Sequence, residues 1–271
     1  MKVVLVDNGS LEPAAHEGLR AAASALAAAL RVDVEAVSWK HSDRIDPALL
    51  GSGPARTLAP WVRSQVSAGE REFLFVPFFI SPQGAIGSAL RGDLGRLQAE
   101  TGGFEFSFAE GLADTPALAA IVADRIAEAA SAHGLRRPAV VVVDHGGPSR
   151  ASAEVRDRVA AGALAALGER VGTLRTASME SPQGAGFEHN RPLLADALRG
   201  LGAGDVIIAP LFLLPGRHAG PGGDLERIAA DAEAASPGLR CRFTGLVGSH
   251  PAAIEALAAS VAAVLRAGAV P

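Results

Sequence analysis

The amino-acid sequence predicts an α/β protein: two tandem repeats of a doubly wound, four-stranded parallel sheet, with helices on both faces and a cleft between the halves. Two observations carry this prediction. Short apolar runs alternate along the chain with longer stretches of helical period, a pattern typical of βαβ units. The chain also repeats itself, since residues 3–10 (VVLVDNGS) return as 140–147 (VVVVDHGG), and residues 75–80 (FVPFFI) return as 208–213 (IAPLFL).

The strands are expected where the apolar runs lie. These runs are continuously apolar rather than alternating, which indicates strands covered on both faces of a sheet. Because strands and helices alternate, the strands should be parallel and joined by right-handed crossovers. We expect four strands in each repeat, at residues 3–6, 32–39, 73–79 and 104–108, and then at 139–143, 173–179, 206–213 and 239–246.

Helices are expected in the connections, for example over residues 13–30 and 151–167. The boundary between the repeats should follow Gly134, since glycine can end a helix in the left-handed conformation and the nearby Pro138 cannot continue one. The sequence therefore predicts an N-terminal repeat of residues 1–136 and a C-terminal repeat of residues 137–271. At 271 residues, the chain is long enough for two domains with real cores.

Composition excludes several classes of function. The net charge of −4, from 25 basic and 29 acidic residues, indicates neither a nucleic-acid partner nor binding to an acidic membrane. Cys241 is the only cysteine, which excludes disulfides and thiolate metal clusters and suits a reducing compartment. No apolar run approaches the roughly 20 residues that span a bilayer, and the N-terminus shows no signal-peptide pattern. We expect a soluble cytoplasmic protein.

The ends of the strands carry the candidate site. In open parallel sheets, ligands bind beyond the carboxyl ends of the strands. In the C-terminal repeat these ends carry His145, Glu180 and His218, whereas the N-terminal repeat has Asn8, Lys40 and Ala85 at the matching places. If packing alone required these side chains, both repeats would be expected to carry them. The asymmetry therefore predicts a single active site, in the C-terminal repeat.

Two chemistries suit this set of side chains. Two imidazoles and a carboxylate can bind a divalent metal and leave positions open. They can equally accept protons, since imidazole titrates near neutral pH. A histidine at the end of a strand can also be a hydrogen-bonded loop residue, and this interpretation stays open for each histidine taken singly.

Other candidates receive structural interpretations. His250 stands between Ser249, a good helix cap, and Pro251, which suits a first turn. His189 lies near the Glu180 loop, where we expect solvated surface, with the lining of a cleft as the alternative. His16 and His133 are assigned to solvent. The glycine-rich residues 220–224 are interpreted either as an anion-binding nest or as a lid.

The motifs after these strands resemble one family, the CbiX/SirB sirohydrochlorin chelatases, which are class II tetrapyrrole chelatases. The resemblance rests on Val-Asp-His-Gly at residues 143–146, on Glu180, and on Pro-Leu-Phe-Leu-x-x-Gly-x-His at residues 210–218. It covers essentially the whole chain, as a two-repeat long form. It implies that His145 and His218 bind metal and accept protons, that Glu180 assists, and that the N-terminal repeat is inactive.

The resemblance further implies the reaction: insertion of Co²⁺ or Fe²⁺, as a substrate, into sirohydrochlorin or a related tetrapyrrole of cobalamin or sirohaem biosynthesis. It implies no organic cofactor. Internal duplication implies a monomer, although a dimer is also compatible. Neither the physiological metal nor the tetrapyrrole follows from the sequence, since divalent metals follow the Irving–Williams order of affinity at such sites.

Two features depart from the family pattern. Residues 218–226 (HAGPGGDLE) are longer than the usual segment from that histidine to Asp-Ile-Pro and lack its proline, and Gly147 stands where Ser is common. The longer segment favours a second hypothesis, a tetrapyrrole or metal carrier that uses the same cleft without turnover. A third hypothesis is a two-domain binder of small ligands with incidental histidines.

Overall fold

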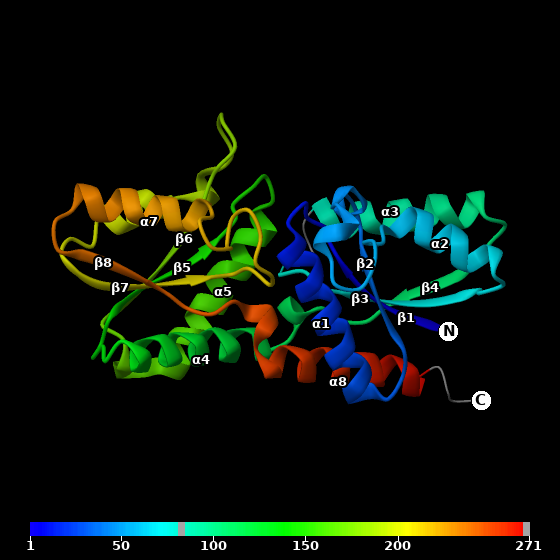
Figure 1. The fold of residues 1–271 in the computed structure, drawn as a ribbon. Helices are drawn as coiled ribbons and strands as arrows, with labels where there is room; N and C mark the ends of the chain where they lie inside the picture. Colours follow the sequence, from blue (N-terminus) through cyan, green and yellow to red (C-terminus); the bar gives the residue numbers. More distant parts are fainter. Residues whose placement is uncertain (81–84, 268–271) are drawn as a thin grey trace. The chain divides into compact units, whose positions relative to one another are not determined.

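The computed structural model describes residues 1–80 and 85–267, apart from the side chains of residues 85, 86 and 114. Two four-stranded parallel sheets form, with the strand orders β2-β1-β3-β4 and β6-β5-β7-β8. Each sheet carries helices on both faces (Figure 1). The fold is therefore the α/β fold that the sequence predicts. In the described residues, no helix is both long enough and apolar enough to cross a membrane.

Every predicted strand is present. The first sheet contains β1 (Lys2–Asp7), β2 (Val34–Ser38), β3 (Glu72–Pro77) and β4 (Glu105–Phe108), and the second contains β5 (Ala139–Asp144), β6 (Thr173–Ser178), β7 (Gly204–Pro210) and β8 (Leu239–Phe243). Five strands (β2, β3, β6, β7 and β8) end one to three residues earlier than their predicted runs. The run after β7 continues to Leu213 because Leu211 and Leu213 are buried, although neither pairs with β8.

The helices fill the predicted connections. They are α1 (Pro13–Leu30), α2 (Leu58–Ser67), α3 (Ala85–Glu100), α4 (Ala117–Ala132), α5 (Arg150–Leu167), α6 (Leu194–Arg199), α7 (Asp224–Ala235) and α8 (Pro251–Ala267). The α1 helix matches the predicted residues 13–30, and its proline stands in the first turn, where the missing N–H costs no helical hydrogen bond.

The chain folds into two compact units that exchange their last helices. The first unit holds residues 1–115 together with α8, and the second holds residues 116–250, which include α4. Thus α4 packs against α5 and β7, and α8 packs against α1. Each exchanged helix buries an apolar stripe, for example Leu118 and Ile121 in α4 and Leu257 and Val261 in α8. The sequence repeat and the compact unit are therefore different divisions of the same chain.

The two cores differ in their side chains. In the first unit, Trp61 and Phe104 pack edge-to-face against Phe73. The core of the second unit is aliphatic, and residues 140–143 of β5 are fully buried. Continuous burial of β1, β3, β5 and β7 explains why the apolar runs of these central strands do not alternate. The edge strands do not fit that expectation: β4 and β6 alternate between exposed and partly buried residues, because a strand at the edge of the sheet is less covered. Because the central strands are apolar along their length, polar side chains follow only where these strands end.

Candidate metal site in the second unit

Backbone hydrogen bonds join the ends of β5, β6 and β7. The amide of Met179 donates to the carbonyl of Asp144 (2.8 Å), and the amide of Glu180 donates to the carbonyl of His145 (3.1 Å). The amide of Leu211 donates to the carbonyl of Val143 (2.8 Å). The residues that follow these strands therefore start from one rigid edge of the sheet.

A glycine lets two of these strand ends approach each other. Gly146 has a φ of +82°, and a Cβ atom there would lie 1.9 Å from the carbonyl oxygen of Glu180. No residue with a side chain fits this position without displacing the backbone. In the Asp-His-Gly sequence, the glycine therefore allows the two strand ends to pack closely. The fold places no such demand on the histidine side chain.

The three predicted side chains lie together. The rings of His145 and His218 are edge-to-face, with their centroids 4.7 Å apart. Glu180 Oε1 lies 3.7 Å from His145 Nε2. Phe212 lies beside both rings, with its centroid 6.5 Å from each. All three polar side chains are accessible, with relative exposures of 46% for His145, 60% for Glu180 and 30% for His218.

Hydrogen bonds orient both imidazoles in the same way. His145 Nδ1 lies 2.9 Å from the carbonyl oxygen of Gly146. His218 Nδ1 lies 2.5 Å from Asp224 Oδ2. A carbonyl or carboxylate oxygen can only accept, so each Nδ1 carries the proton. The Nε2 lone pair of each ring is then free to bind a metal or a proton.

Asp224 orients His218, whereas from the sequence we placed it only in the glycine-rich residues 220–224 and gave it no part in the site. It begins α7, and the hydrogen bond from His218, together with one from Arg227, lowers the pKa of its carboxyl group. Arg217 Nε also lies 3.7 Å from Asp224 Oδ2. The available signal was a carboxylate at a predicted helix start, close in sequence to a candidate histidine.

The set is open. Across residues 1–80 and 85–267, no group of three or more His, Cys, Asp or Glu side chains is placed so that it could hold a metal ion, so His145, Glu180 and His218 are not a ready-made three-ligand set. Two oriented imidazoles and one exposed carboxylate beside them leave coordination positions open to other ligands. Such a set suits an ion that arrives and leaves better than a permanently bound one. A cavity of about 170 Å³ adjoins His218 between the segment after β7 and the end of β8.

Comparison with known proteins identifies the family. The CbiX family model matches the chain twice, at residues 2–129 and 139–264. The chain belongs to the CbiX family. No curated protein sequence matches it. The two matches are the two repeats found in the sequence, and together they cover nearly all of the chain.

Solved structures share this CbiX-family fold. SirB from Bacillus subtilis with Fe³⁺ has a TM-score of 0.66 at 16% identity, over 99% of this chain and 98% of that one. SirB from Bacillus subtilis subspecies spizizenii, in complex with cobalt, has a TM-score of 0.70 at 14% identity, over 97% and 94%. CbiX, the terminal enzyme for biosynthesis of sirohaem in denitrifying bacteria, has a TM-score of 0.64 at 22% identity, over 97% and 99%.

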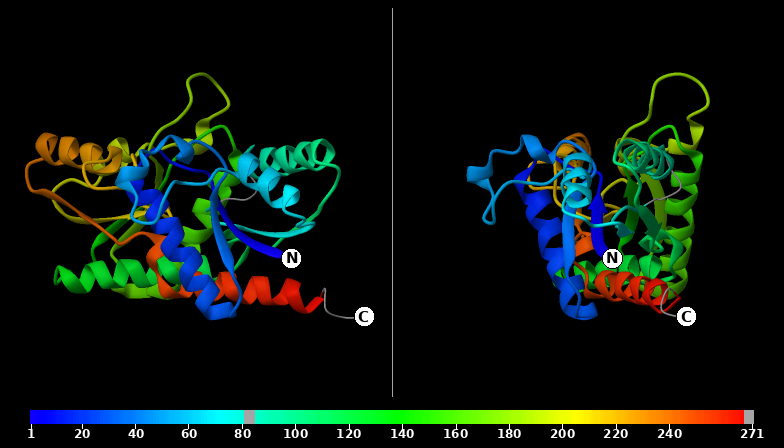
Figure 2. Two further views of the ribbon diagram at one scale, coloured as in Figure 1. Left: turned by 45° about the vertical axis from the view of Figure 1, so that its right-hand side comes forward. Right: turned by 90° about the vertical axis from the view of Figure 1, so that its right-hand side faces the viewer.

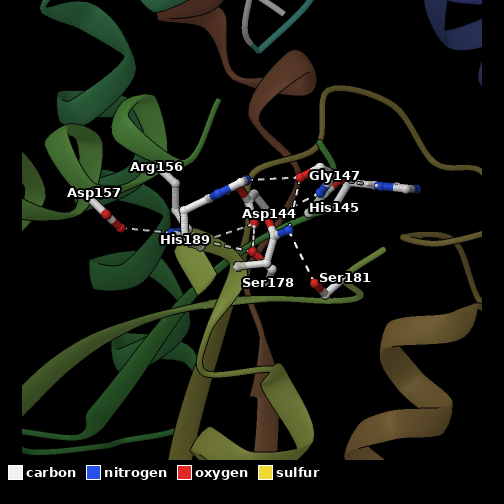
Figure 3. Close-up of polar contacts among 10 residues, drawn as sticks. Asp144, His145, Gly147, Arg156, Asp157, Ser178, Ser181 and His189 are labelled. Carbon is white, nitrogen blue, oxygen red and sulfur yellow. Dashed lines mark hydrogen bonds and ion pairs between the residues drawn. The ribbon is translucent and has the colours of Figure 1, made fainter. Parts of the chain in front are cut away.

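A buried network supports the end of β5 (Figure 3). The Arg156 side chain is only 3% exposed. Its Nη1 donates to Ser178 Oγ (2.7 Å) and approaches Asp144 Oδ1 (3.4 Å), and Ser178 Oγ donates to the same Asp144 oxygen (2.6 Å). Burial raises the pKa of Asp144, and the Ser178 hydrogen bond and Arg156 oppose that rise. The signal for this network was an arginine on the apolar face of α5, beside Ala153 and Ala160.

A second contact fixes the loop that follows His145. Asn190 is buried, and its amide bonds both backbone groups of Gly147: Nδ2 donates to the carbonyl (2.9 Å), and Oδ1 accepts from the N–H (3.2 Å). His189 Nε2 also lies 3.0 Å from the Gly147 carbonyl oxygen. The expectation of solvated surface for His189 is therefore wrong, because the ring packs against this loop. The connection from β6 to α6, which carries both residues, stands out from its unit (Figure 2).

His16 corrects another prediction. It is 1% exposed rather than solvated, because it shares the buried face of α1 with Leu19 and Leu26. His133 is exposed, as predicted. His250 immediately precedes α8 and lies 3.9 Å from Asp124, with a side chain that is 12% exposed.

The glycine-rich segment after His218 is not an anion-binding nest. The amides of Gly220 and Gly223 donate to the carbonyls of Gly216 and Gly220. The amide of Leu225 donates to the carbonyl of His218, and that of Gly222 donates to Glu226. The segment satisfies its own N–H groups, so it offers none of these to an anion.

Proposed function

We propose that this chain is a metal chelatase that inserts a divalent ion, Co²⁺ or Fe²⁺, into sirohydrochlorin or a related tetrapyrrole. His145, Glu180 and His218 would bind the metal substrate and accept protons. The observation that carries the proposal is the pair of facing imidazoles whose Nδ1 atoms are both occupied as donors. Membership of the CbiX family supports it, as do the iron and cobalt that accompany related SirB structures.

The arrangement suits the chemistry of metal insertion. A divalent ion that enters a free-base tetrapyrrole replaces two pyrrole N–H protons, so the site must supply a metal and remove protons. The Nε2 atoms of His145 and His218 would hold the ion loosely until ring nitrogens replace them. Glu180, at 60% exposure and 3.7 Å from His145, would accept a departing proton or pass it to solvent. No step needs an organic cofactor.

A second candidate, a tetrapyrrole or metal carrier, is favoured by the segment after His218. This segment, residues 218–226, departs from the family pattern in its length and in lacking the proline, and it bonds its own backbone N–H groups. A carrier would use the same histidines. It differs from a chelatase only in the rate at which metal enters the ring.

Visible absorbance of sirohydrochlorin mixed with Co²⁺ or Fe²⁺ separates the two candidates. We expect metallation above the spontaneous rate in the wild type, a loss of about 100-fold or more in His145→Ala and in His218→Ala, and an unchanged rate in Asn8→Ala. Asn8 is the matched control because it is exposed at the corresponding place in the first repeat. Binding of the ring without acceleration would indicate a carrier, and binding of neither the ring nor the metal would overturn both candidates.

A further inference from the structure

The orientation of His145 depends on a flexible peptide group. His145 Nδ1 donates to the carbonyl oxygen of Gly146 (2.9 Å). That carbonyl and the N–H of Gly147 belong to the same peptide group, between two glycines with φ values of +82° and +153°. Glycines restrict such a group little, because they lack a Cβ. Rotation of the peptide would remove the acceptor from His145.

Asn190 holds this peptide group from the other side. Its Oδ1 accepts from the Gly147 N–H (3.2 Å), and its Nδ2 donates to the Gly147 carbonyl (2.9 Å) and lies 3.4 Å from Ser181 Oγ. Asn190 is itself 1% exposed. An unbroken chain of hydrogen bonds therefore runs from Asn190 through the Gly146–Gly147 peptide to His145 Nδ1.

We propose that Asn190 is a positioning residue that sets the tautomer of His145, through the Gly146–Gly147 peptide group. With Nδ1 protonated, Nε2 presents its lone pair toward His218 and Glu180. Without Asn190, the peptide rotates, the proton can move to Nε2, and the ring loses its free nitrogen on the side of the site. The consequence for metal insertion rests on the proposed function, whereas the tautomer does not.

The first repeat supplies a matched control. There, Ser42 Oγ bonds both the N–H (3.1 Å) and the carbonyl (3.0 Å) of Ser10, which occupies the place of Gly147 in the repeat. Ser42 is also buried, at 1% exposure. Ser42→Ala therefore removes comparable hydrogen bonds to the backbone of a loop that carries Asn8 instead of a histidine. It should lower stability without affecting His145.

The test is the tautomer itself, read from ¹H–¹⁵N correlations of protein labelled in its 7 histidines. His145 is assigned by the signals that His145→Gln lacks. We expect the Nδ1–H form in the wild type, loss of this form in Asn190→Ala, and its retention in Ser42→Ala. Asn190→Asp keeps an oxygen facing the Gly147 N–H and should retain it as well. An unchanged tautomer in Asn190→Ala would overturn the proposal.

A measurement on the wild type covers the case in which Asn190→Ala does not fold. The Gly147 amide lies in a loop, yet the bond to Asn190 should slow its hydrogen exchange by about 100-fold or more relative to an open loop amide. Exchange at the unprotected rate would overturn the proposal.

Co²⁺ affinity separates this proposal from the function. Asn190→Ala should weaken Co²⁺ binding by about 10-fold, as loss of an orienting partner does at metal sites, and Ser42→Ala should not. If the tautomer changes as expected but the wild type does not metallate sirohydrochlorin, the proposed function fails and the role of Asn190 stands.

Discussion

The ends of β1 and β5 carry the same backbone hydrogen bonds. At β1, the amides of Trp39 and Lys40 donate to the carbonyls of Asp7 and Asn8 (2.8 and 3.2 Å). At β5, the amides of Met179 and Glu180 make the equivalent bonds to Asp144 and His145 (2.8 and 3.1 Å). The glycine that follows is also equivalent: a Cβ on Gly9 would lie 1.7 Å from a carbonyl oxygen, as one on Gly146 would lie 1.9 Å from its own.

The side chains between these shared bonds differ. Asn8 stands where the second repeat has His145, and Lys40 stands where it has Glu180. Ala85, the counterpart of His218 in the sequence, begins α3, and residues 81–84 lie outside the described part of the chain. The first repeat forms the same strand end with none of these polar groups. The fold therefore does not require the histidines and Glu180, and their presence points to chemistry.

The polar groups buried beneath the two strand ends differ as well. In the second unit, Arg156 pairs with Asp144. The counterpart of Arg156 in the first unit is Leu19. The two are 137 residues apart in the sequence, as are Asp7 and Asp144. Asp7 is left with Ser38 as its side-chain partner, and its Oδ1 has no hydrogen bond in the described residues. A buried ion pair therefore stabilises the end of β5, and the end of β1 has no such pair in the described residues.

Removing the buried cation should have the largest effect. Arg156→Leu copies the first repeat but leaves the Asp144 carboxylate buried without its partner. We expect it to lower the free energy of unfolding at neutral pH by about 3–5 kcal/mol. Urea denaturation measures the loss. The double variant Arg156→Leu/Asp144→Asn should recover much of it, and a loss below about 1 kcal/mol in the single variant would show that the pair does not hold this strand end.

The unpaired carboxyl group of the first unit gives a smaller effect with a defined pH dependence. Burial raises the pKa of Asp7 from 3.8 to about 6. The folded state therefore keeps a proton that the unfolded state releases, so the contribution of Asp7 to stability is full below pH 3.8 and is lost as the pH rises to about 6.

Asp7→Asn should remove this dependence. Relative to the wild type, we expect the variant to gain on the order of 2 kcal/mol in free energy of unfolding as the pH rises from about 4 to about 7. The pKa of buried His16 is lowered to about 4, which changes stability in the opposite sense. His16 lies 3.4 Å from the Ser38 hydroxyl that also bonds Asp7, so the two proteins are compared in a His16→Gln background. Urea denaturation at several pH values measures the free energy of unfolding of both proteins. If the difference between them did not change with pH, this would contradict an elevated pKa for Asp7.

Much of this architecture could be predicted because the signals are local. Continuous apolar runs define the strands, helical period defines α1 and α5, and the register of the repeat places His145, Glu180 and His218 at one sheet edge. What could not be predicted depends on tertiary packing. Nothing in the sequence near α4 and α8 says that each packs on the unit of the other repeat, because an apolar stripe fits either sheet.

The supporting residues of the site were missed for a related reason. Arg156 resembles the many other arginines of this chain until its helix buries it against Asp144. Asn190 ends a single 3₁₀ turn (Glu188–Asn190) and contacts Gly147, which is 43 residues away in the sequence. His16 was misassigned because one polar residue on an apolar helix face looks solvated until its burial is known. Residues that orient others are recognised by their contacts, which only the folded chain supplies.

Co²⁺ titration, without any tetrapyrrole, tests the central claim that only the second repeat binds metal. The visible absorbance of bound Co²⁺ is followed in the wild type, in Asn8→Ala and in His145→Ala. We predict one bound ion per chain, unchanged in Asn8→Ala and lost in His145→Ala. Two equivalent ions per chain, or full binding by His145→Ala, would contradict the assignment of the site to the histidines of the second repeat.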